Sequence, residues 1–434
     1  MKSKNPIRIV TIDSFDGKGR GKGTTETGGV LSVPFTAPGD VVEAAKTKSR
    51  TGRLERIVTP SPQRIDSVCR HFALCGGCSR QFLSYAHQLE YKKAAVAEWF
   101  QQRQLNYDFT DVEITPSPPY GYRNRMDFVW NWDGSFGLRE QGCWYRVVDL
   151  SECHLLPPDV MEIAFEINRR VHGAGLPFRD SKRKTPGMRY LIVRRGVMTG
   201  EVMLLFVSDE MQLPESLWSG FDRVASVYQL VNNNAENDQS DGEPMLLSGS
   251  PTFRERVLDH TFDVGPRTFF QPNPVVAGDM ASHLRGFLKE KPGRRLLDLF
   301  CGAGFFSALL ADVCAETLGV ELVAEAAQLA RRNAPQANAQ FVCMEAERMA
   351  SLNLSGYDVL LIDPPRSGLH PKTLKWIEQQ SFEEILYVSC NPKRGAEDIA
   401  LMREQYQVDS VALFDQFPQT PHVEMIARLV RTVS

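Results

Sequence analysis

Residues 296–311 read LLDLFCGAGFFSALLA: an apolar run, a Gly-rich turn and a second apolar run. The first run is typical of a buried strand, and the second of a helix that follows it directly. Gly302 and Gly304 let the backbone approach a ligand closely, and the N–H groups at the start of the helix point at that ligand. The next apolar strand ends in Glu321, where an acid is suited to hydrogen-bond a ribose diol. The stretch therefore predicts a nucleotide-type cofactor site at the strand ends of an α/β fold.

The same alternation continues on both sides of this stretch. From about residue 275, apolar strands alternate with helical patterns, which predicts a parallel sheet covered on both faces. The turn lacks the full G-x-G-x-x-G spacing of dinucleotide binders. Together with Glu321 and with Asp363 of LIDPPRSG (361–368), it resembles a class I S-adenosylmethionine methyltransferase.

Two further parts precede this domain. Residues 1–62 show short strands broken by Gly and Pro, which predicts a small barrel. Its polar positions lean basic, and a solvated face and a nucleic-acid surface explain that equally well. Residues 63–262 contain a helical pattern at 84–103 and a strand-rich remainder, so we expect three domains: 1–62, 63–262 and 263–434.

Composition excludes several classes of protein. The chain has 434 residues and a net charge of −3, and no apolar run reaches the ~18 residues that a membrane span needs. The first residues lack the apolar core of a secretory signal. We therefore expect a cytoplasmic protein with no membrane contact, in which thiols stay reduced.

Three of the 9 cysteines lie close together in CRHFALCGGCSRQF (69–82). Cys69, Cys75 and Cys78 have the spacing C-x5-C-x2-C, which a disulfide, a zinc site or an iron–sulfur cluster could each use. A reducing compartment argues against the disulfide. Zinc usually takes paired C-x2–4-C spacings or nearby histidines, and only one such pair is present, with His71 inside the loop. A fourth ligand is absent locally.

A solitary cysteine follows a later apolar strand. In YVSCNP (387–392), Cys390 stands at the strand end, where α/β sheets place active sites, and Asn391-Pro392 breaks the strand at once. A free thiol is mostly protonated at neutral pH, so a catalytic role requires a site that stabilises the thiolate. Farther on, the expected strand that carries His422 and Glu424 offers Glu424 as a candidate base.

The ordered motifs FFQPNP (269–274), DLFCGAGFFS, DPPRSG, SCNP and HVE resemble the RNA (uracil-5-)-methyltransferase family, which makes 5-methyluridine. Residues 1–62 resemble its TRAM domain, YRNRMDF (122–128) matches a family segment, and the three clustered cysteines match its iron–sulfur branch. The resemblance thus covers nearly the whole chain.

The resemblance implies a role for each matching residue. Cys390 is then the nucleophile that adds to carbon 6 of uracil, and Glu424 is the base that removes the carbon-5 proton. The implied contacts to S-adenosylmethionine are Gln271, Phe300, Gly302, Glu321, Glu345 and Asp363. Phe305 stands where one branch has Asn, so the corresponding contact is not expected.

The resemblance also supplies the fourth cluster ligand. Cys153 in DLSECHLL (149–156) matches the family's fourth cysteine, and four thiolates suit a 4Fe–4S cluster that joins two segments of the chain. Cys143 is a possible substitute, but it lies in a strand pattern and lacks the family match. A structural or RNA-orienting role is expected in preference to redox chemistry.

The expected partner is RNA, and the expected state a monomer. Within the family that the chain resembles, a TRAM-like barrel and a cysteine cluster imply 23S rRNA as substrate, with transfer RNA as the alternative and a non-catalytic RNA-binding protein as another. Phe269 is expected to stack on the flipped base. Fewer than half of the following basic residues are expected to contact RNA: Arg123, Arg125, Lys182, Arg183, Lys184, Arg194, Arg195, Lys393 and Arg394.

Overall fold

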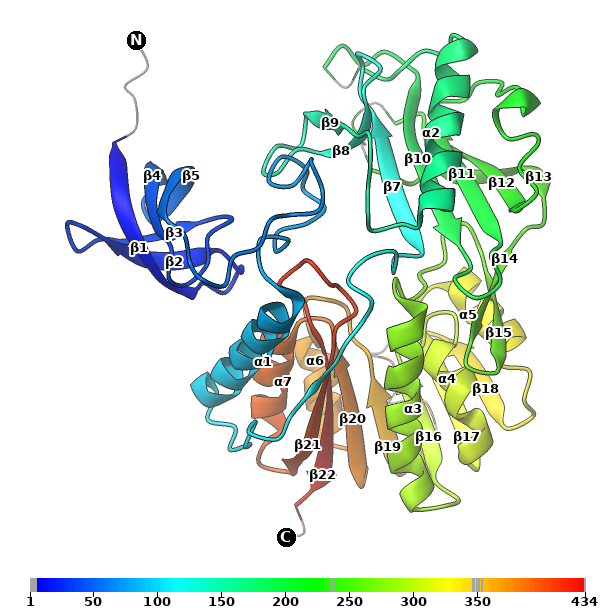
Figure 1. Ribbon diagram of the computed structural model, residues 1–434. Coiled ribbons are helices and arrows are strands. Elements are labelled where there is room, and N and C mark those ends of the chain that lie inside the picture. The colour runs from blue at the N-terminus through cyan, green and yellow to red at the C-terminus, as the bar shows by residue number, and fades with distance from the viewer. Residues whose placement is uncertain are drawn as a thin grey trace.

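The computed structural model describes residues 6–180, 182–234, 236, 239–345, 348, 352 and 354–432. It has an N-terminal barrel, a central sheet and a larger α/β part that contains the C-terminus (Figure 1). The expected α/β fold with an N-terminal β-barrel is confirmed.

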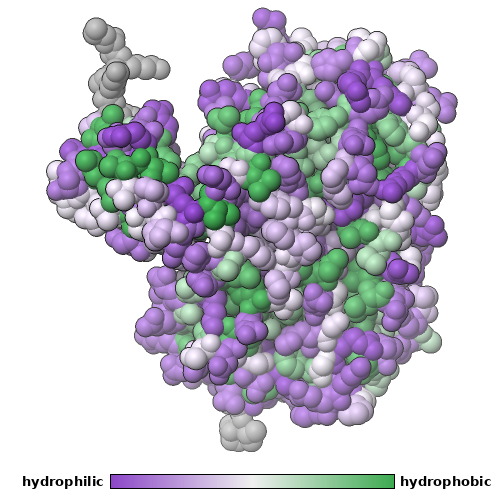
Figure 2. Space-filling view, in the orientation of Figure 1, coloured by the Kyte–Doolittle hydropathy of each residue, from purple (hydrophilic) through white to green (hydrophobic). Residues whose placement is uncertain are grey.

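The barrel is closed, with the strand order β1-β2-β3-β5-β4. Alternate residues of its strands point inward, and Val10, Ile12 and Val33 fill the interior. The barrel contacts the rest of the chain through Phe15, because the Arg80 guanidinium lies 3.6 Å from the centre of the Phe15 ring. A hollow separates the barrel from the body of the molecule below it (Figure 2). The strands are β1 (Ile7–Phe15), β2 (Gly21–Thr25), β3 (Val30–Val33), β4 (Val41–Lys48) and β5 (Thr51–Thr59).

The central part is a seven-stranded sheet with the order β13-β12-β11-β10-β7-β8-β9. Only the β11–β12 pair is parallel. Helix α2 (Pro158–Gly173) covers one face, and a separate hairpin, β14–β15, leads to the next part. The strands are β7 (Arg125–Trp130), β8 (Phe136–Arg139), β9 (Val147–Asp149), β10 (Met188–Arg195), β11 (Val202–Ser208), β12 (Val224–Val231), β13 (Glu243–Gly249), β14 (Phe253–Val257) and β15 (His260–Val264), with a 3-10 turn η1 (Glu215–Leu217).

The third part, which we call the eight-stranded sheet, has the strand order β18-β17-β16-β19-β20-β22-β21-β6. The first five are parallel, as expected, and almost entirely apolar because both faces are covered. Strand β22 runs antiparallel to both of its neighbours, β20 and β21, which the sequence alternation did not predict. The strands are β6 (Ile114–Thr115), β16 (Arg295–Leu299), β17 (Glu316–Glu321), β18 (Ala339–Cys343), β19 (Val359–Ile362), β20 (Glu384–Ser389), β21 (Tyr406–Phe414) and β22 (Glu424–Arg431).

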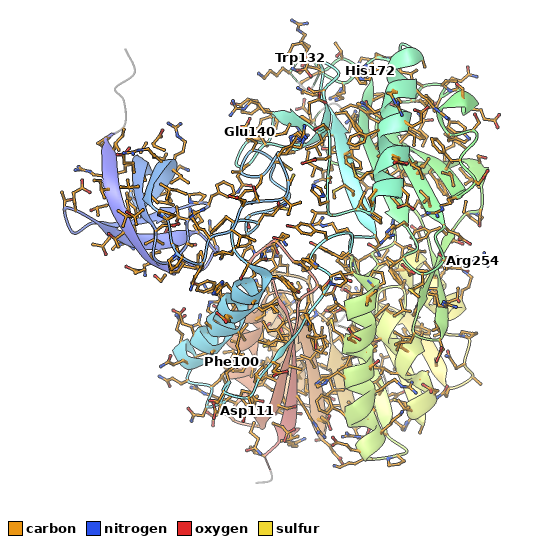
Figure 3. The ribbon with its side chains drawn as sticks, viewed as in Figure 1. Phe100, Asp111, Trp132, Glu140, His172 and Arg254 are labelled. Atoms are coloured by element: carbon orange, nitrogen blue, oxygen red, sulfur yellow. The ribbon has the colours of Figure 1, made fainter. Side chains whose placement is uncertain are left out.

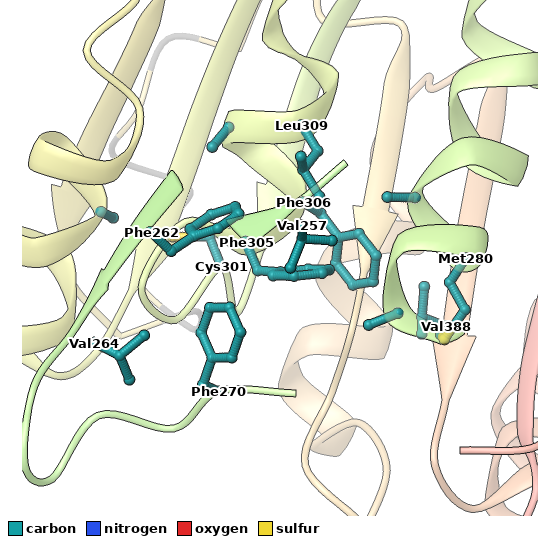
Figure 4. Packing of buried hydrophobic residues seen from close by; sticks show 14 of the residues in the cluster. Val257, Phe262, Val264, Phe270, Met280, Cys301, Phe305, Phe306, Leu309 and Val388 are labelled. Carbon is teal, nitrogen blue, oxygen red and sulfur yellow. The ribbon is translucent and has the colours of Figure 1, made fainter. Parts of the chain in front are cut away.

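Two apolar clusters cover the faces of this sheet. Helices α3, α4 and α5 pack on one face, where Phe262, Phe270 and Phe305 meet beside α4 (Figure 4). Phe305 is therefore a core residue. Helices α1, α6 and α7 pack on the other face. The helices are α1 (Tyr85–Gln102), α3 (Pro274–Glu290), α4 (Phe305–Leu310), α5 (Ala324–Asn333), α6 (Pro371–Glu378) and α7 (Pro392–Met402), with a 3-10 turn η2 (Ala311–Val313).

The helical pattern at 84–103 forms α1, which Ser84 caps by accepting the His87 N–H. This helix packs against α7, and β6 forms the outer edge of the eight-stranded sheet beside β21. The expected central segment 63–262 is thus divided in space. Residues 85–115 belong with the eight-stranded sheet, because Val96 and Phe100 are buried in its core.

Candidate active site and cysteine cluster

The Gly-rich turn after β16 forms one wall of a cavity of about 470 Å³. Gly304 has a φ of +80°, and a Cβ there would lie 3.1 Å from Ala330, so the turn requires glycine. Glu321, at the end of β17, accepts hydrogen bonds from the N–H groups of Gly302 at 3.0 Å and Val323 at 2.7 Å. The turn and the acid thus meet at one cavity, as the sequence predicts.

A buried acid supports this turn from below. Ser307 of α4 donates a hydrogen bond to Asp298 of β16 at 2.5 Å. Burial raises the pKa of Asp298 to about 6. The pair ties the strand end to the start of the helix and fixes the path of the turn.

The candidate cofactor residues differ in where they lie. Gly302 and Glu321 line the cavity, whereas the other four candidates do not. Gln271 is buried and accepts a hydrogen bond from Gln416 at 3.2 Å, and Phe300 packs against the α1 side of the core. Glu345 is exposed and pairs with Arg348 at 3.3 Å. Asp363 follows β19, and its charge acts on Cys390, which is described next.

Cys390 opens onto a second cavity, of about 610 Å³, between the barrel, residues 76–80 and the strand ends. It follows β20 directly and precedes α7, so the predicted position at a strand exit is confirmed. Burial and the negative charges of Glu424 and Asp363 raise the pKa of the Cys390 thiol to about 12, and the charge of Arg366 opposes them. In the free protein the thiol is protonated.

Glu424 is the first residue of β22 and is 5% exposed. Because β22 runs antiparallel to β20, its beginning lies at the edge where β19 and β20 end. Cys390, Asp363 and Glu424 therefore converge from three strands. Burial and the charge of Asp363 raise the pKa of Glu424 to about 8, and burial raises that of Asp363 to about 7.

Two further side chains stand beside this group. The Arg366 guanidinium is 3.2 Å from both ring nitrogens of His422, and Asn391 donates to the Arg366 carbonyl at 3.0 Å. Burial and the Arg366 charge lower the pKa of His422 to about 4, so its imidazole is neutral. His422 precedes β22 and does not lie in the strand. Arg366 was not predicted, although its place in DPPRSG beside Asp363 was the available signal.

The four predicted cluster cysteines are free thiols. They lie close enough that the charge of one raises the pKa of another. Cys75, Cys78 and Cys153 pack against the core of the central sheet. Burial raises the pKa of Cys78 to about 12 and that of Cys153 to about 11, and it also raises the pKa of Cys69 and Cys75.

Within the described ranges, no group of three or more His, Cys, Asp or Glu is arranged around a single metal ion. This does not conflict with a four-iron cluster, because there each thiolate ligates a different iron and the sulfurs lie farther apart. Four half-buried thiols with no disulfide between them fit such a group.

Cys143 lies in the turn between β8 and β9, beside Arg146, so its expected position in a strand is wrong. Only Val147–Asp149 of that apolar pattern form a strand. His71 accepts the Ser151 N–H at 3.0 Å, which ties the cysteine loop to the segment that carries Cys153.

The candidate RNA-contact residues differ in whether RNA could reach them. Phe269 is 71% exposed at the first cavity, and Arg123 lines the second. Arg125 is held by Asp127 at 2.8 Å. Arg194 is buried and donates to the Gly265 carbonyl at 2.7 Å, so it is not available to a phosphate.

Comparison with known proteins gives consistent matches. The sequence profile of the family described as tRNA (Uracil-5-)-methyltransferase matches residues 256–432. A tRNA (uracil(54)-C(5))-methyltransferase of Pyrococcus horikoshii is 34% identical over 407 residues, which are 93% of this chain and 96% of that protein. An uncharacterized RNA methyltransferase of Caldanaerobacter subterraneus is 31% identical and covers 99% of this chain and 100% of that protein.

A solved structure covers nearly the full length. The crystal structure of the Pyrococcus abyssi tRNA (uracil-54, C5)-methyltransferase in complex with S-adenosyl-L-homocysteine has a TM-score of 0.83 and 31% identity, over 98% of this chain and 99% of that one. Among the described residues, no helix combines the length and apolar character that crossing a membrane requires. With this full-length similarity, and with its cofactor-type turn, the chain belongs to the RNA (uracil-5-)-methyltransferase family and is an S-adenosylmethionine-dependent enzyme.

Proposed function

We propose that this enzyme methylates carbon 5 of a uridine in transfer RNA, with Cys390 as the nucleophile and Glu424 as the base. The observation that carries the proposal is the convergence of Cys390, Asp363 and Glu424 at one sheet edge, beside a cavity open to solvent. A thiol and a buried carboxylate at one site are what a substitution through a covalent adduct requires.

The chemistry follows from the weakness of carbon 5 as a nucleophile. The Cys390 thiol loses its proton, and its sulfur adds to carbon 6, which turns the ring into an enolate with electron density on carbon 5. S-Adenosylmethionine supplies the electrophilic methyl group. Glu424 then takes the carbon-5 proton, the carbon-5–carbon-6 double bond re-forms, and the Cys390 thiolate leaves. The net products are a methylated uracil, S-adenosylhomocysteine and one proton.

Charge at the site controls when each group reacts. Glu424 and Asp363 both have raised pKa values near neutral pH, so one of them holding a proton removes a negative charge from beside Cys390. The Arg366 charge lowers the pKa of both the thiol and the Glu424 carboxyl. Arg366 therefore favours the thiolate for attack and the carboxylate for proton removal.

Two sets of residues hold the groups that the reaction needs. Gly302 and Glu321 bind S-adenosylmethionine at the first cavity, and the resemblance adds Gln271, Phe300, Glu345 and Asp363. The four cysteines 69, 75, 78 and 153 ligate a 4Fe–4S cluster that holds the loop 69–80 against the central sheet. Phe269 and Arg123 contact the RNA.

The choice of transfer RNA over the expected 23S rRNA rests on the relatives. Proteins named tRNA (uracil(54)-C(5))-methyltransferase match this chain over 93% of its length. The barrel does not discriminate, because a solved transfer-RNA enzyme aligns over 98% of this chain and so includes it. The relatives favour uridine 54 as the target.

The test is methyl transfer from labelled S-adenosylmethionine to three RNAs: an unmodified transfer RNA transcript, the same transcript with cytidine at position 54, and unmodified 23S rRNA. Incorporation into the first alone is expected. Incorporation into rRNA and not transfer RNA overturns the substrate, and incorporation into the cytidine variant overturns the position.

A further inference from the structure

The surface of the central sheet far from the active site carries three exposed aromatic side chains. Trp132, Trp144 and Tyr145 are 58%, 68% and 50% exposed. They come from the turn between β7 and β8 and the turn between β8 and β9, and we call them the aromatic patch. All three line one cavity of about 330 Å³, which the methylation chemistry does not use. Exposed aromatic residues gathered at a cavity mark a binding surface.

Positive charge surrounds the aromatic patch. Five basic residues and two acidic ones line the cavity. The Lys182 ammonium lies 5.3 Å, and the Arg146 guanidinium 6.0 Å, from the centre of the Tyr145 ring. The two acidic residues are engaged locally: Asp133 accepts the Ser135 N–H at 3.0 Å, and Asp180 accepts the Lys182 N–H at 2.9 Å.

Arg146 pairs with Glu140 at 2.5 Å and Arg189 with Asp209 at 3.1 Å, so acids outside the cavity lining neutralise these two basic residues. Arg139 contacts the Tyr190 hydroxyl at 3.0 Å, and within the described residues neither Arg139 nor Lys182 pairs with a carboxylate. Basic groups interleaved with exposed aromatic rings suit a chain of phosphates that carries stacked bases.

The aromatic patch lies away from the cavity at which the target base is expected. Strand β7 has Arg125 at the end near Phe269 and Trp130 at the other, about 17 Å apart for five residue steps. Figure 3 shows Trp132 at the outer end of the central part, with Glu140 on the side that faces the barrel. A base at this patch is not the base that reaches Cys390.

The cysteine loop, residues 69–80, holds the turn that carries Trp144. The Gly76 N–H donates to the Arg139 carbonyl at 2.9 Å, and the Gln141 N–H donates to the Leu74 carbonyl at 2.8 Å. These bonds flank the Cys75–Glu140 bridge. These backbone hydrogen bonds to the cysteine loop hold in place the turn that carries Trp144 and Tyr145.

We propose that the aromatic patch is a second RNA-binding site, which stacks an unpaired base of the substrate on Trp144 or Trp132 while Lys182 and Arg139 contact the adjacent phosphates. This inference rests on the proposed function, because it takes the enzyme's own RNA substrate as the ligand. The site increases affinity for the whole RNA and takes no part in the chemical step.

The test compares wild type with Trp132→Ala/Trp144→Ala and Trp144→Phe. Met198→Ala is the matched control, since Met198 is 56% exposed on the same central part but outside the patch. Dissociation constants are measured with two probes: an unmodified full-length transfer RNA transcript, and a short stem-loop that carries only the target uridine.

The double variant is expected to bind the full transcript about tenfold more weakly, with kcat at saturating RNA unchanged. Trp144→Phe keeps a stacking ring and retains most of the affinity, and Met198→Ala binds as wild type does. Binding of the stem-loop is unchanged in all variants, because it cannot span both sites. Lys182→Gln lowers the slope of log K against log salt by about one unit.

Unchanged affinity of the double variant for the full transcript overturns the inference, and leaves the patch to a protein partner. Equal losses on both probes also overturn it, since they place the patch at the target loop. Failure of wild type to methylate any RNA instead removes the proposed function, so the two failures are distinguishable.

Discussion

The Lys92 ammonium lies 2.6 Å from the Asp415 carboxylate, and both side chains are buried, at 3% and 0% exposure. Lys92 belongs to α1, and Asp415 follows β21 at the start of the segment that leads to Glu424. The same ammonium donates to the Phe417 carbonyl at 3.1 Å. The pair therefore joins the early helix to the backbone that positions the candidate base.

Replacing one member of this pair leaves a buried charge without its partner. Lys92→Met is expected to lower the free energy of unfolding by about 3–5 kcal/mol, measured by urea denaturation. Lys92→Met/Asp415→Asn is expected to recover much of that loss, because no net charge remains buried. Equal destabilisation of the single and double variants would show that the ion pair is not the cause.

The covalent step distinguishes the two reacting residues. Glu424→Gln cannot remove the carbon-5 proton, so its turnover is expected to fall roughly 10²–10⁴-fold while an RNA–protein adduct accumulates on denaturing gels. Cys390→Ala forms no adduct and no product. Glu404→Gln, whose side chain is 89% exposed, serves as control and behaves as wild type. A Glu424→Gln enzyme that turns over freely contradicts the assignment of the base.

The pH dependence tests the role of Arg366. Since kcat/KM reports the ionisations of the free enzyme, we expect it to rise with pH up to the Glu424 pKa of about 8. Removing the positive charge raises the pKa of both Glu424 and Cys390, so Arg366→Gln moves the rising part, or limb, of the kcat/KM profile to higher pH. Arg366→Lys keeps the charge and shifts the limb less. A profile for Arg366→Gln that overlays the wild-type profile contradicts the electrostatic role.

The raised pKa of Glu424 also makes stability depend on pH. A carboxyl whose pKa is raised from about 4.5 to about 8 by folding contributes stability below the lower value, and this is lost as pH rises through the upper one. Glu424→Gln lacks this loss. Its Tm advantage over wild type is therefore expected to grow between about pH 5 and about pH 9, at about 2–4 °C for each kcal/mol. A Tm difference that is constant over this range contradicts the burial of an ionisable group.

Removing a cluster ligand tests the link between the cysteine loop and the active site. The N–H groups of Ser79 and Arg80 donate to the Gln419 carbonyl at 2.9 and 3.1 Å, and Gln419 has a φ of +67°. Cys78→Ser is expected to lose iron and to lower kcat by roughly 10²-fold, because Gln419 lies between Asp415 and Glu424. Cys143→Ser is the control, with iron content and kcat unchanged. An iron-free Cys78→Ser enzyme with the wild-type rate shows that the cluster does not support the site.

Local pattern was sufficient for the parts of the site that follow from strand order. Cys390 and Asp363 each follow an apolar strand of one parallel sheet, so their convergence at the carboxyl edge was predictable. The barrel and α1 were equally visible, from short strands with Gly and Pro turns and from helical periodicity. The Gly-rich turn was also predictable, because the glycines that its backbone conformation requires are visible in the sequence.

Other features depend on contacts that no local pattern records. Strand β6 has two residues, and only its pairing with β21 makes it a strand. Arg366 meets His422 across two loops, which periodicity does not describe. The pattern that begins at Cys143 indicated a strand, but the rings of Trp144 and Tyr145 are exposed in a turn. An apolar run usually indicates a buried segment, but in this turn Trp144 is 68% exposed and its ring contacts the neighbouring Tyr145 ring, with centroids 5.6 Å apart.

The distance along the chain between α1 and its partners has a consequence for biosynthesis. Lys92 and Asp415 are separated by 323 residues, and β22 is the last strand. During translation, the apolar side of α1 stays uncovered for about 15–65 s, until the strands that pack against it have been synthesised. The barrel and central sheet can fold meanwhile, but the edge that carries Glu424 forms only after β22 has emerged. A nascent chain that lacks β22 is therefore aggregation-prone and inactive, and methylation begins only after β22 has been synthesised.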